Sequence, residues 1–297
     1  MPFEKKRLLE LRRMSIEQVS EYYKELRKYE FDNNIPLKHI ELRNNIHKLL
    51  VQIIKIDRLL AKEKIHVIND DRIDSNRPII YACTHIGGND IQRVFEAMKS
   101  PAYLFLGDPK GVYKDTSGLL LFLNGVICLE TYDKEDRKIA KARSIELLNN
   151  GGNLLIFPEG AWNITQNLPV MPLYKGTVEM ARETGADIVS IAIEQYENEF
   201  YINIGRNIEM SKTSELSINE LNELLTDSLA TLKWDIWSTQ GVHLRNDVAN
   251  QTLEEFQQTI IDKCEYGFTV QDVYDTMYKD KNITTPEEAF AYKKRLI

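Results

Sequence analysis

The sequence predicts an α/β protein whose mixed, mainly parallel sheet of about seven strands is flanked by helices. From residue 66 onward, short runs of β-branched and aromatic residues alternate with longer runs that have helical spacing. Such alternation is typical of layered α/β domains. Both ends of the chain show helical spacing alone. We therefore expect three consecutive parts: a basic amphipathic helical segment at residues 1–64, an α/β domain at 65–240 and a helical extension at 241–297.

The composition is that of an ordinary globular protein. Of its 297 residues 43% are apolar, and its three cysteines form no CxxC pair, so we expect reduced thiols in a cytosol. The longest nearly apolar run, residues 118–129, contains Asn124 and is shorter than the ~20 residues that span a bilayer. The first residues are charged and do not resemble a secretion signal. We expect a cytoplasmic protein without a membrane-spanning segment.

Residues 1–64 predict two amphipathic helices, at about 3–31 and 38–64, separated by Asn33-Asn34-Ile35-Pro36. This segment has 15 basic and 10 acidic residues, a net charge of +5, whereas the whole chain carries −7. A basic amphipathic helix can lie on an anionic bilayer, although the same pattern suits a helical hairpin packed on the core. We expect peripheral attachment to the inner face of the membrane through this segment. The negative net charge argues against a nucleic-acid partner.

The rest of the chain follows in order. We expect strands at residues 66–70, 78–84, 102–106, 126–130, 153–157, 187–193 and 199–205. We expect helices at residues 90–99, 134–149, 173–184, 216–236, 251–264, 270–279 and 286–296. Only Gln195-Tyr196-Glu197-Asn198 separates the last two strands, which predicts a hairpin and an antiparallel edge to the sheet.

A candidate catalytic pair follows the second expected strand. There the chain reads His85-Ile86-Gly87-Gly88-Asn89-Asp90 before helical spacing resumes. Gly87 and Gly88 can adopt backbone angles closed to other residues, so the chain can fold back and bring Asp90, in the first helical turn, to the His85 imidazole. A carboxylate that holds one ring nitrogen leaves the other as a base.

Two further polar sites follow the same pattern. Phe157-Pro158-Glu159-Gly160 comes directly after an apolar strand, and Lys175-Gly176 opens the next helix, where an anion can be received. The carboxyl ends of parallel strands meet at one edge of a sheet, which is where open α/β sheets bind ligands. We therefore expect the His85 and Glu159 loops to converge.

Two apolar strands, Gly125-Val126-Ile127 and Asp187-Ile188-Val189-Ser190-Ile191, complete the pattern. In order and spacing, these residues resemble the four motif blocks of the glycerolphosphate/lysophosphatidate acyltransferase superfamily, over roughly residues 65–240. The resemblance implies an acyltransferase-type fold and transfer of a fatty acyl group from acyl-CoA or acyl carrier protein to a hydroxyl of a lysophospholipid or a related lipid or glycolipid. His85 would be the general base, with Asp90 orienting it. Glu159 would organise the acceptor pocket. The acyl thioester would be a cosubstrate, and no cofactor is implied.

The departures from the family pattern concern the residues that hold the acceptor phosphate. Thr131 stands where the second block usually has an arginine, Ala161-Trp162 where the third often has Thr-Arg, and Ser190 where the last has proline. A hydroxyl or an indole does not replace a bidentate guanidinium. We infer an acceptor other than simple lysophosphatidate. The expected substrate-binding residues are Gly87, Gly88, Arg93, Thr131, Glu159, Gly160, Trp162 and Lys175.

The sequence also allows functions other than acyl transfer. Cys83 and His85 share one face of a strand, which allows a Cys-His nucleophilic pair. The other histidines are scattered and form no HxxxH motif, so no metal site is expected. A lipid- or acyl-binding protein that has lost turnover remains an alternative. So does a thioester or lipid hydrolase that uses the same His-Asp pair on water.

Overall fold

The computed structural model describes residues 3–114, 116–165, 168–241, 253–263 and 267–278. The chain forms two compact units, each built from separate stretches of sequence. The first unit comprises Met1–Leu50 and Pro101–Leu155, and the second comprises Val51–Ser100 and Ile156–Ile297. The division of the sequence into three consecutive parts therefore stays a prediction.

The predicted fold class is confirmed: the protein has a seven-stranded, mainly parallel mixed sheet flanked by helices. The strand order is β1-β7-β6-β2-β5-β3-β4. The strands are β1 (Lys64–Asp70), β2 (Ile79–Cys83), β3 (Tyr103–Gly107), β4 (Val126–Leu129), β5 (Leu154–Ile156), β6 (Asp187–Tyr196) and β7 (Glu199–Ile208). Each corresponds to one of the strands expected from the sequence.

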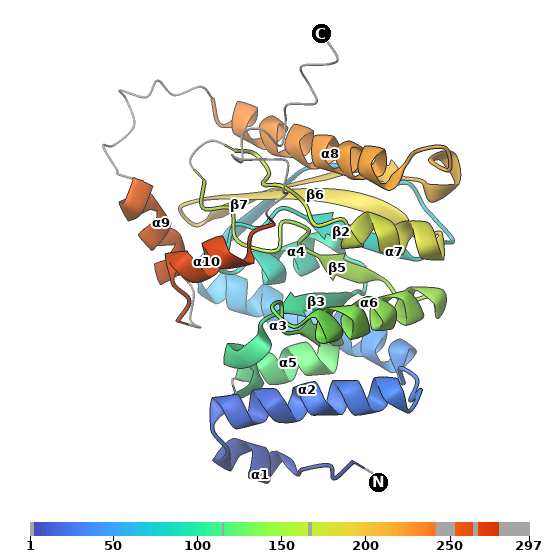
Figure 1. Cartoon of the computed structure of the whole chain (residues 1–297). Helices are drawn as coiled ribbons and strands as arrows, with labels where there is room; N and C mark the ends of the chain where they lie inside the picture. Colours follow the sequence, from blue (N-terminus) through green and yellow to red (C-terminus); the bar gives the residue numbers. More distant parts are fainter. Residues whose placement is uncertain (1–2, 115, 166–167, 242–252, 264–266, 279–297) are drawn as a thin grey trace. The chain divides into compact units, whose positions relative to one another are not determined.

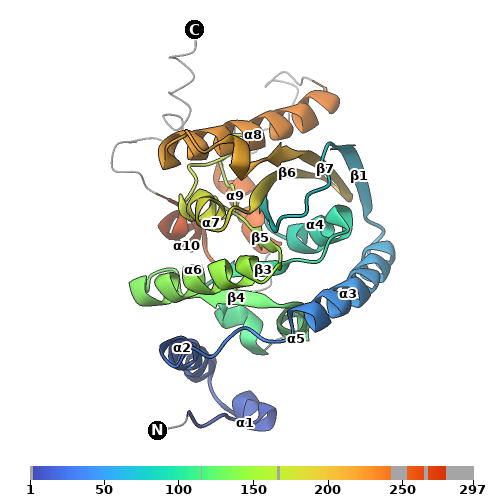
Figure 2. The same cartoon turned by 90° about the vertical axis from the view of Figure 1, so that its right-hand side faces the viewer.

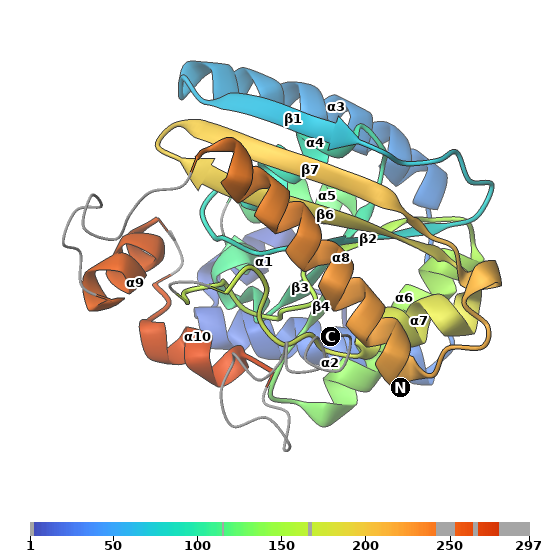
Figure 3. The ribbon, with the colours of Figure 1, turned by 90° about the horizontal axis from the view of Figure 1, so that it is seen from above.

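In the second unit, β6 and β7 form the expected antiparallel hairpin, which closes on the pair Tyr196 and Glu199. The prediction that this hairpin ends the sheet is wrong. Strand β1 pairs in parallel with the outer side of β7, with Ile65 opposite Phe200, so β1 is the edge (Figure 3). The short connection between β6 and β7 predicts only that these two strands are neighbours. The position of β1 depends on its pairing with β7, more than 130 residues later in the chain.

Helices cover both faces of this part of the sheet. The second unit contains α4 (Asp90–Met98), α7 (Gly176–Thr184), α8 (Ile218–Thr239), α9 (Leu253–Asp262), α10 (Val270–Thr276) and the short 3-10 helix η2 (Met210–Lys212). Helix α8 lies across one face of β6 and β7, and α4 lies on the opposite face (Figures 1 and 2). Ser217 caps α8 through a reciprocal bond with Glu220. The helix expected at 286–296 lies outside the described residues.

The first unit holds the N-terminal helices. Its helices are α1 (Leu8–Arg13), α2 (Ile16–Asp32), the first half of α3 (Ile40–Leu60), the 3-10 helix η1 (Pro109–Lys114), α5 (Thr116–Asn124) and α6 (Lys134–Asn149). The expected single helix over residues 3–31 is wrong. Ser15 and Gln18 form a capping box that starts α2 anew. Helix α5 was not expected, because its continuous apolar run lacks helical periodicity.

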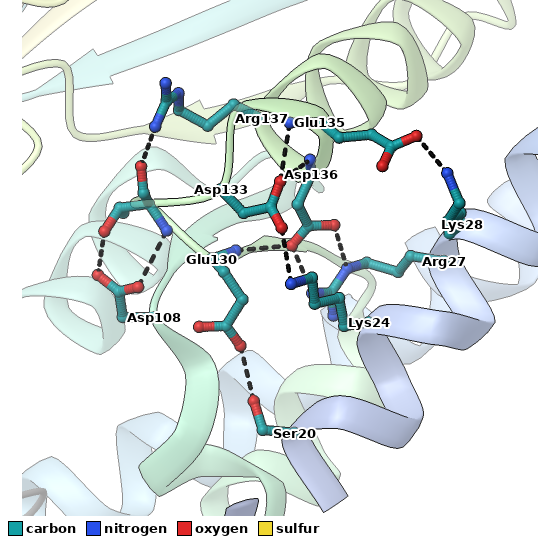
Figure 4. A network of polar contacts seen from close by, with 11 residues as sticks. Ser20, Lys24, Arg27, Lys28, Asp108, Glu130, Asp133, Glu135, Asp136 and Arg137 are labelled. Atoms are coloured by element: carbon teal, nitrogen blue, oxygen red, sulfur yellow. Dashed lines mark hydrogen bonds and ion pairs between the residues drawn. The ribbon is translucent and has the colours of Figure 1, made fainter.

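Helix α2 is fixed to the start of α6 by a row of polar contacts (Figure 4). The Arg27 guanidinium makes two bonds of 3.0 and 2.6 Å to Asp136, whose side chain is 2% exposed. The row is completed by the pairs Ser20–Glu130, Lys24–Asp133 and Lys28–Glu135. Much of the positive charge of α2 is thereby paired within the protein.

Candidate active site

Strand β6 positions the chain that leads into His85. Strand β2 ends at Cys83, but Thr84 keeps two further bonds to β6: its N–H donates to the Ile191 carbonyl at 3.0 Å, and its hydroxyl accepts the Ile193 N–H at 3.0 Å. The loop therefore leaves the sheet at His85 itself. Because Thr84 is 1% exposed, this anchor lies inside the core.

The structure brings His85 and Asp90 together, as the sequence predicts. The Asp90 Oδ2 atom lies 2.7 Å from His85 Nδ1 and accepts the backbone N–H groups of Ile86 and Gly87 at 2.9 and 3.0 Å. Gly87 and Gly88 have φ values of +82° and +62°, the left-handed conformation in which glycine is unstrained. Asp90 is the first residue of α4.

This arrangement fixes which nitrogen of His85 can act as a base. An ionised carboxylate can only accept hydrogen bonds, so Nδ1 carries the proton and Nε2 keeps its lone pair. The Asp90 side chain is 1% exposed and that of His85 is 16% exposed. The Phe157 ring stacks on the imidazole with a centroid distance of 4.2 Å, which fixes the plane of the ring.

Glu159 joins the two motif loops from inside the core. One carboxylate oxygen accepts the His85 backbone N–H at 2.9 Å, and the other accepts the Met171 N–H at 2.8 Å. The side chain is fully buried, and this burial raises the pKa of Glu159 to about 7, although the two backbone N–H groups favour the charged form. Glu159 thus holds the backbone of His85. Its expected role in the acceptor pocket stays a prediction.

The residues after Glu159 turn sharply and bring an aromatic side chain next to His85. Gly160 has a φ of +72°, and a Cβ atom there would lie 2.4 Å from the Tyr174 ring, so only glycine fits. The Trp162 ring lies edge-on to His85 with a centroid distance of 6.1 Å. A Cβ atom on Gly87 would lie 3.4 Å from the indole. The His85 and Glu159 loops therefore converge, as expected.

Comparison with known proteins shows which family the sequence around this site is similar to. Residues 64–194 match the model of the acyltransferase family. The comparisons support a resemblance to the lysophosphatidate acyltransferase superfamily, from which the sequence diverges.

One curated protein and one solved structure are similar to this chain. The 1-acyl-sn-glycerol-3-phosphate acyltransferase of Borreliella burgdorferi is 24% identical over 188 residues, which cover 59% of this chain and 74% of the relative. The crystal structure of the 1-acyl-sn-glycerophosphate acyltransferase PlsC from Thermotoga maritima superimposes with a TM-score of 0.55 at 15% identity. That match covers 80% of this chain and 98% of the other. At this low sequence identity, the match shows a similar fold. Among the described helices of this chain, none is long and apolar enough to cross a membrane.

The two cations of the predicted substrate site, Arg93 and Lys175, have different surroundings. Arg93 is fully buried, and its guanidinium lies 2.6 Å from Glu63 and 3.4 Å from Asp57, so its charge is already paired. Lys175 lies half-buried directly before α7, and no described residue accepts a hydrogen bond from its ammonium. Of the two cations, Lys175 is the one available to an anionic substrate group.

Thr131 belongs to the first unit and is held there by its own neighbours. Its hydroxyl and its N–H donate to the two Asp108 carboxylate oxygens at 2.5 and 3.0 Å, and its carbonyl accepts a bond from Arg137. Figure 4 labels the two partners, Asp108 and Arg137. The hydroxyl proton is therefore used within the unit, which weakens the expectation that Thr131 binds substrate.

The described residues do not support a Cys-His nucleophilic pair at Cys83. Cys83 is fully buried, and burial raises the pKa of its thiol well above the ordinary value, so the thiol stays protonated and is a poor nucleophile. Cys128 is likewise buried and free, and Cys264 lies outside the described residues. Within the described ranges, no three His, Cys, Asp or Glu side chains come close enough to hold a metal ion.

Sequence reasoning missed a buried ion pair beside Thr84. The Lys233 ammonium of α8 lies 2.8 Å from Glu194 and donates to the Ile193 carbonyl at 2.5 Å, while the Trp237 indole donates to Glu194 at 3.0 Å. Burial acts to raise the pKa of Glu194, but Lys233 outweighs it and the pKa lies below the ordinary value. The bond from Lys233 fixes Ile193, whose backbone N–H donates to the Thr84 hydroxyl. The sequence offered one sign of this pair: Lys233 is a single lysine on the apolar face of the helix that became α8.

We expect Glu159 to make the stability of the protein depend on pH. Its pKa is about 7 in the folded protein and about 4.5 in the unfolded chain, so the folded state binds the proton more tightly. The stabilisation is complete below about pH 4.5 and is lost as the pH rises to 7, by an amount on the order of 3 kcal/mol. Glu159→Gln should remove this slope from the free energy of unfolding measured by urea titration at several pH values.

The control for this measurement is Glu183→Gln, which changes an exposed carboxylate on α7. It should keep the slope of the wild-type protein. The assignment would be contradicted if Glu159→Gln and Glu183→Gln showed the same pH dependence.

Proposed function

We propose that this protein transfers a fatty acyl group from an acyl thioester, carried by CoA or acyl carrier protein, to a hydroxyl of a lysophospholipid or related lipid or glycolipid. The observation that carries the proposal is the His85–Asp90 contact, in a loop held by Glu159 at the carboxyl end of β2. The acyltransferase family model and the relative from Borreliella burgdorferi support the same class of reaction.

In the proposed reaction His85 Nε2 takes the proton from the acceptor hydroxyl. The acceptor oxygen attacks the thioester carbonyl carbon, the carbon–sulfur bond breaks, and the imidazolium returns the proton to the leaving thiolate. Asp90 stabilises the imidazolium that exists between these steps. The acceptor is activated directly, so neither a covalent acyl-enzyme nor a cofactor is required.

We infer that the preferred acceptor is not simple lysophosphatidate, because the site offers few groups to bind its phosphate. Arg93 is paired with Glu63, and the Thr131 hydroxyl is paired with Asp108, which leaves Lys175 as the cation for an anionic group. A single ammonium binds phosphate as a point charge and lacks the two parallel bonds of a guanidinium.

The acceptor is tested with purified protein and a panel of lysolipid, glycolipid and hydroxy-amide acceptors. Each is offered with acyl-CoA and with acyl carrier protein donors, and the products are identified by mass spectrometry. We expect turnover with at least one acceptor to exceed turnover with lysophosphatidate by about tenfold or more, which corresponds to one lost charge-assisted contact. Preferential turnover of lysophosphatidate would contradict the inference.

The catalytic pair is tested with His85→Ala and Asp90→Asn. We expect His85→Ala to lower kcat by about 10²- to 10⁴-fold, because the general base is lost, while thioester binding is retained. Asp90→Asn should lower kcat about 10²-fold or more, because an amide stabilises the imidazolium poorly. The control is His66→Ala, which removes a half-exposed histidine on β1. Equal rates for His85→Ala and His66→Ala would exclude the mechanism.

We also propose that α3 is the part of residues 1–64 that contacts the membrane. Leu42, Leu49, Ile53, Ile56 and Leu60 form one stripe along this helix, and their exposed fractions range from 45% to 79%. Lys48 and Lys55 are exposed on the same helix, about 120° or more around it from the stripe, and the exposed Lys62 follows its C-terminal end. Long lysine side chains can reach anionic headgroups while the stripe enters the acyl boundary.

Membrane contact is tested by flotation with vesicles that contain anionic lipid. We expect Ile53→Glu with Ile56→Glu to lower the bound fraction at least about tenfold, because two charges enter the apolar stripe. The control is Leu224→Glu, which places a charge at an exposed leucine of α8. Unchanged flotation of the α3 variant would show that the membrane is contacted elsewhere or not at all.

A further inference from the structure

The C-terminal helices pack on the segment that follows Gly160. Helices α9 and α10, which lie side by side in Figure 1, contribute one side of a shared apolar core, and Ala161, Ile164 and Met171 contribute the other. The buried members are Ala161, Ile164, Met171, Ile260, Ile261, Val273 and Met277. The Tyr174 hydroxyl adds a 2.7 Å bond to the Thr276 carbonyl. These helices are therefore an integral part of the second unit.

Trp162 is where this core meets the catalytic loop. Its indole packs edge-on against Phe268 at a centroid distance of 5.6 Å and lies 6.1 Å from the His85 ring. A Cβ atom built on Gly87 would lie 3.4 Å from Trp162 and 3.5 Å from Ile260. The side chains of Trp162 and Ile260 therefore lie directly against the backbone of the loop that carries His85.

The surroundings of His85 are largely apolar as a result. Phe157 stacks on the ring, and Trp162 closes a second side. Trp162 packs against the apolar cluster that contains Ile260 of α9, and its indole contacts Phe268, which lies just before α10. Without them the indole would lose its packing and would be free to leave the loop.

We propose that α9 and α10 form a fixed wall that keeps water from His85, so that the acyl thioester is transferred to the acceptor and not hydrolysed. Ile260 and Phe268 are the residues of the wall that decide this selectivity, and they act by holding Trp162. The inference rests on the proposed acyl transfer and deepens it.

The need for such a wall follows from the mechanism. A His-Asp base removes a proton from water as readily as from an acceptor hydroxyl. With water, the proton passes to Nε2, the water oxygen attacks the thioester carbonyl carbon, the carbon–sulfur bond breaks, and the thiolate takes the proton. The products are a free fatty acid and a free thiol. Excluding water from a closed site suppresses such side reactions.

The wall also accounts for one departure of the sequence from the family pattern. Ala161-Trp162 stands where the family often has Thr-Arg, and both residues pack in the core formed with α9 and α10. A threonine and an arginine there would bury a hydroxyl and a charge in an apolar cluster, which is unfavourable without partners. The changed motif and the C-terminal helices thus depend on each other.

The test compares Ile260→Ala and Phe268→Ala in the full chain, using the best donor and acceptor from the panel above. Mass spectrometry gives the ratio of free fatty acid to acylated acceptor. We expect both variants to raise this ratio about tenfold, because water gains access to the base. The control is Ile236→Ala, which truncates an equally buried aliphatic side chain in a separate cluster with Ala192 and Leu232. It should lose stability without changing the ratio.

A second measurement is hydrogen exchange of the peptide covering residues 84–90, followed by mass spectrometry. We expect faster exchange in Ile260→Ala and Phe268→Ala and wild-type exchange in Ile236→Ala. An unchanged product ratio despite faster exchange would overturn the proposal, and so would unchanged exchange. If the wild-type protein forms no acyl product, the proposed function fails, and hydrogen exchange alone then decides whether the wall excludes water from the loop.

Discussion

The structure of the site depends on one buried carboxylate. Glu159 accepts the backbone N–H of His85 with one oxygen and that of Met171 with the other, and it has no exposure to solvent. Burying a carboxylate is costly unless strong donors compensate, so the two loops must come close enough to supply them. The position of His85 is therefore fixed through its backbone, before Asp90 fixes its side chain.

Buried polar contacts also fix the chain that precedes His85, beginning at Thr84. This residue continues the pairing of β2 with β6 by one further step, and the buried Lys233–Glu194 pair holds β6 at the neighbouring Ile193. A base must keep its direction to within a small angle, and rigid sheet and helix elements achieve this better than a free loop. The loop that carries His85 is thus short and anchored at both ends, by Thr84 and by the start of α4.

The N-terminal helices show how similar sequences take different roles. Helices α2 and α3 are both amphipathic, yet α2 pairs Arg27 with Asp136 and buries its apolar side, while α3 leaves a stripe of large aliphatic residues exposed. Periodicity identifies an apolar face but not what covers it. The difference arises from α6, which presents acidic residues to α2 at its N-terminus, where negative charge is favoured.

The strands, most helices and the His85–Asp90 contact could be predicted from the amino-acid sequence, because they follow from local patterns. Alternating apolar runs place strands, and Gly87-Gly88 before Asp90 leaves few ways to close the loop. The sequence also indicated that the Glu159 loop lies nearby, since parallel strands end at one edge. Only the tertiary structure decided that β1 flanks β7, that Arg93 is paired with Glu63, and that Ile260 and Phe268 pack against Trp162. Each of these contacts joins residues at least thirty positions apart, and no local pattern specifies such a partner.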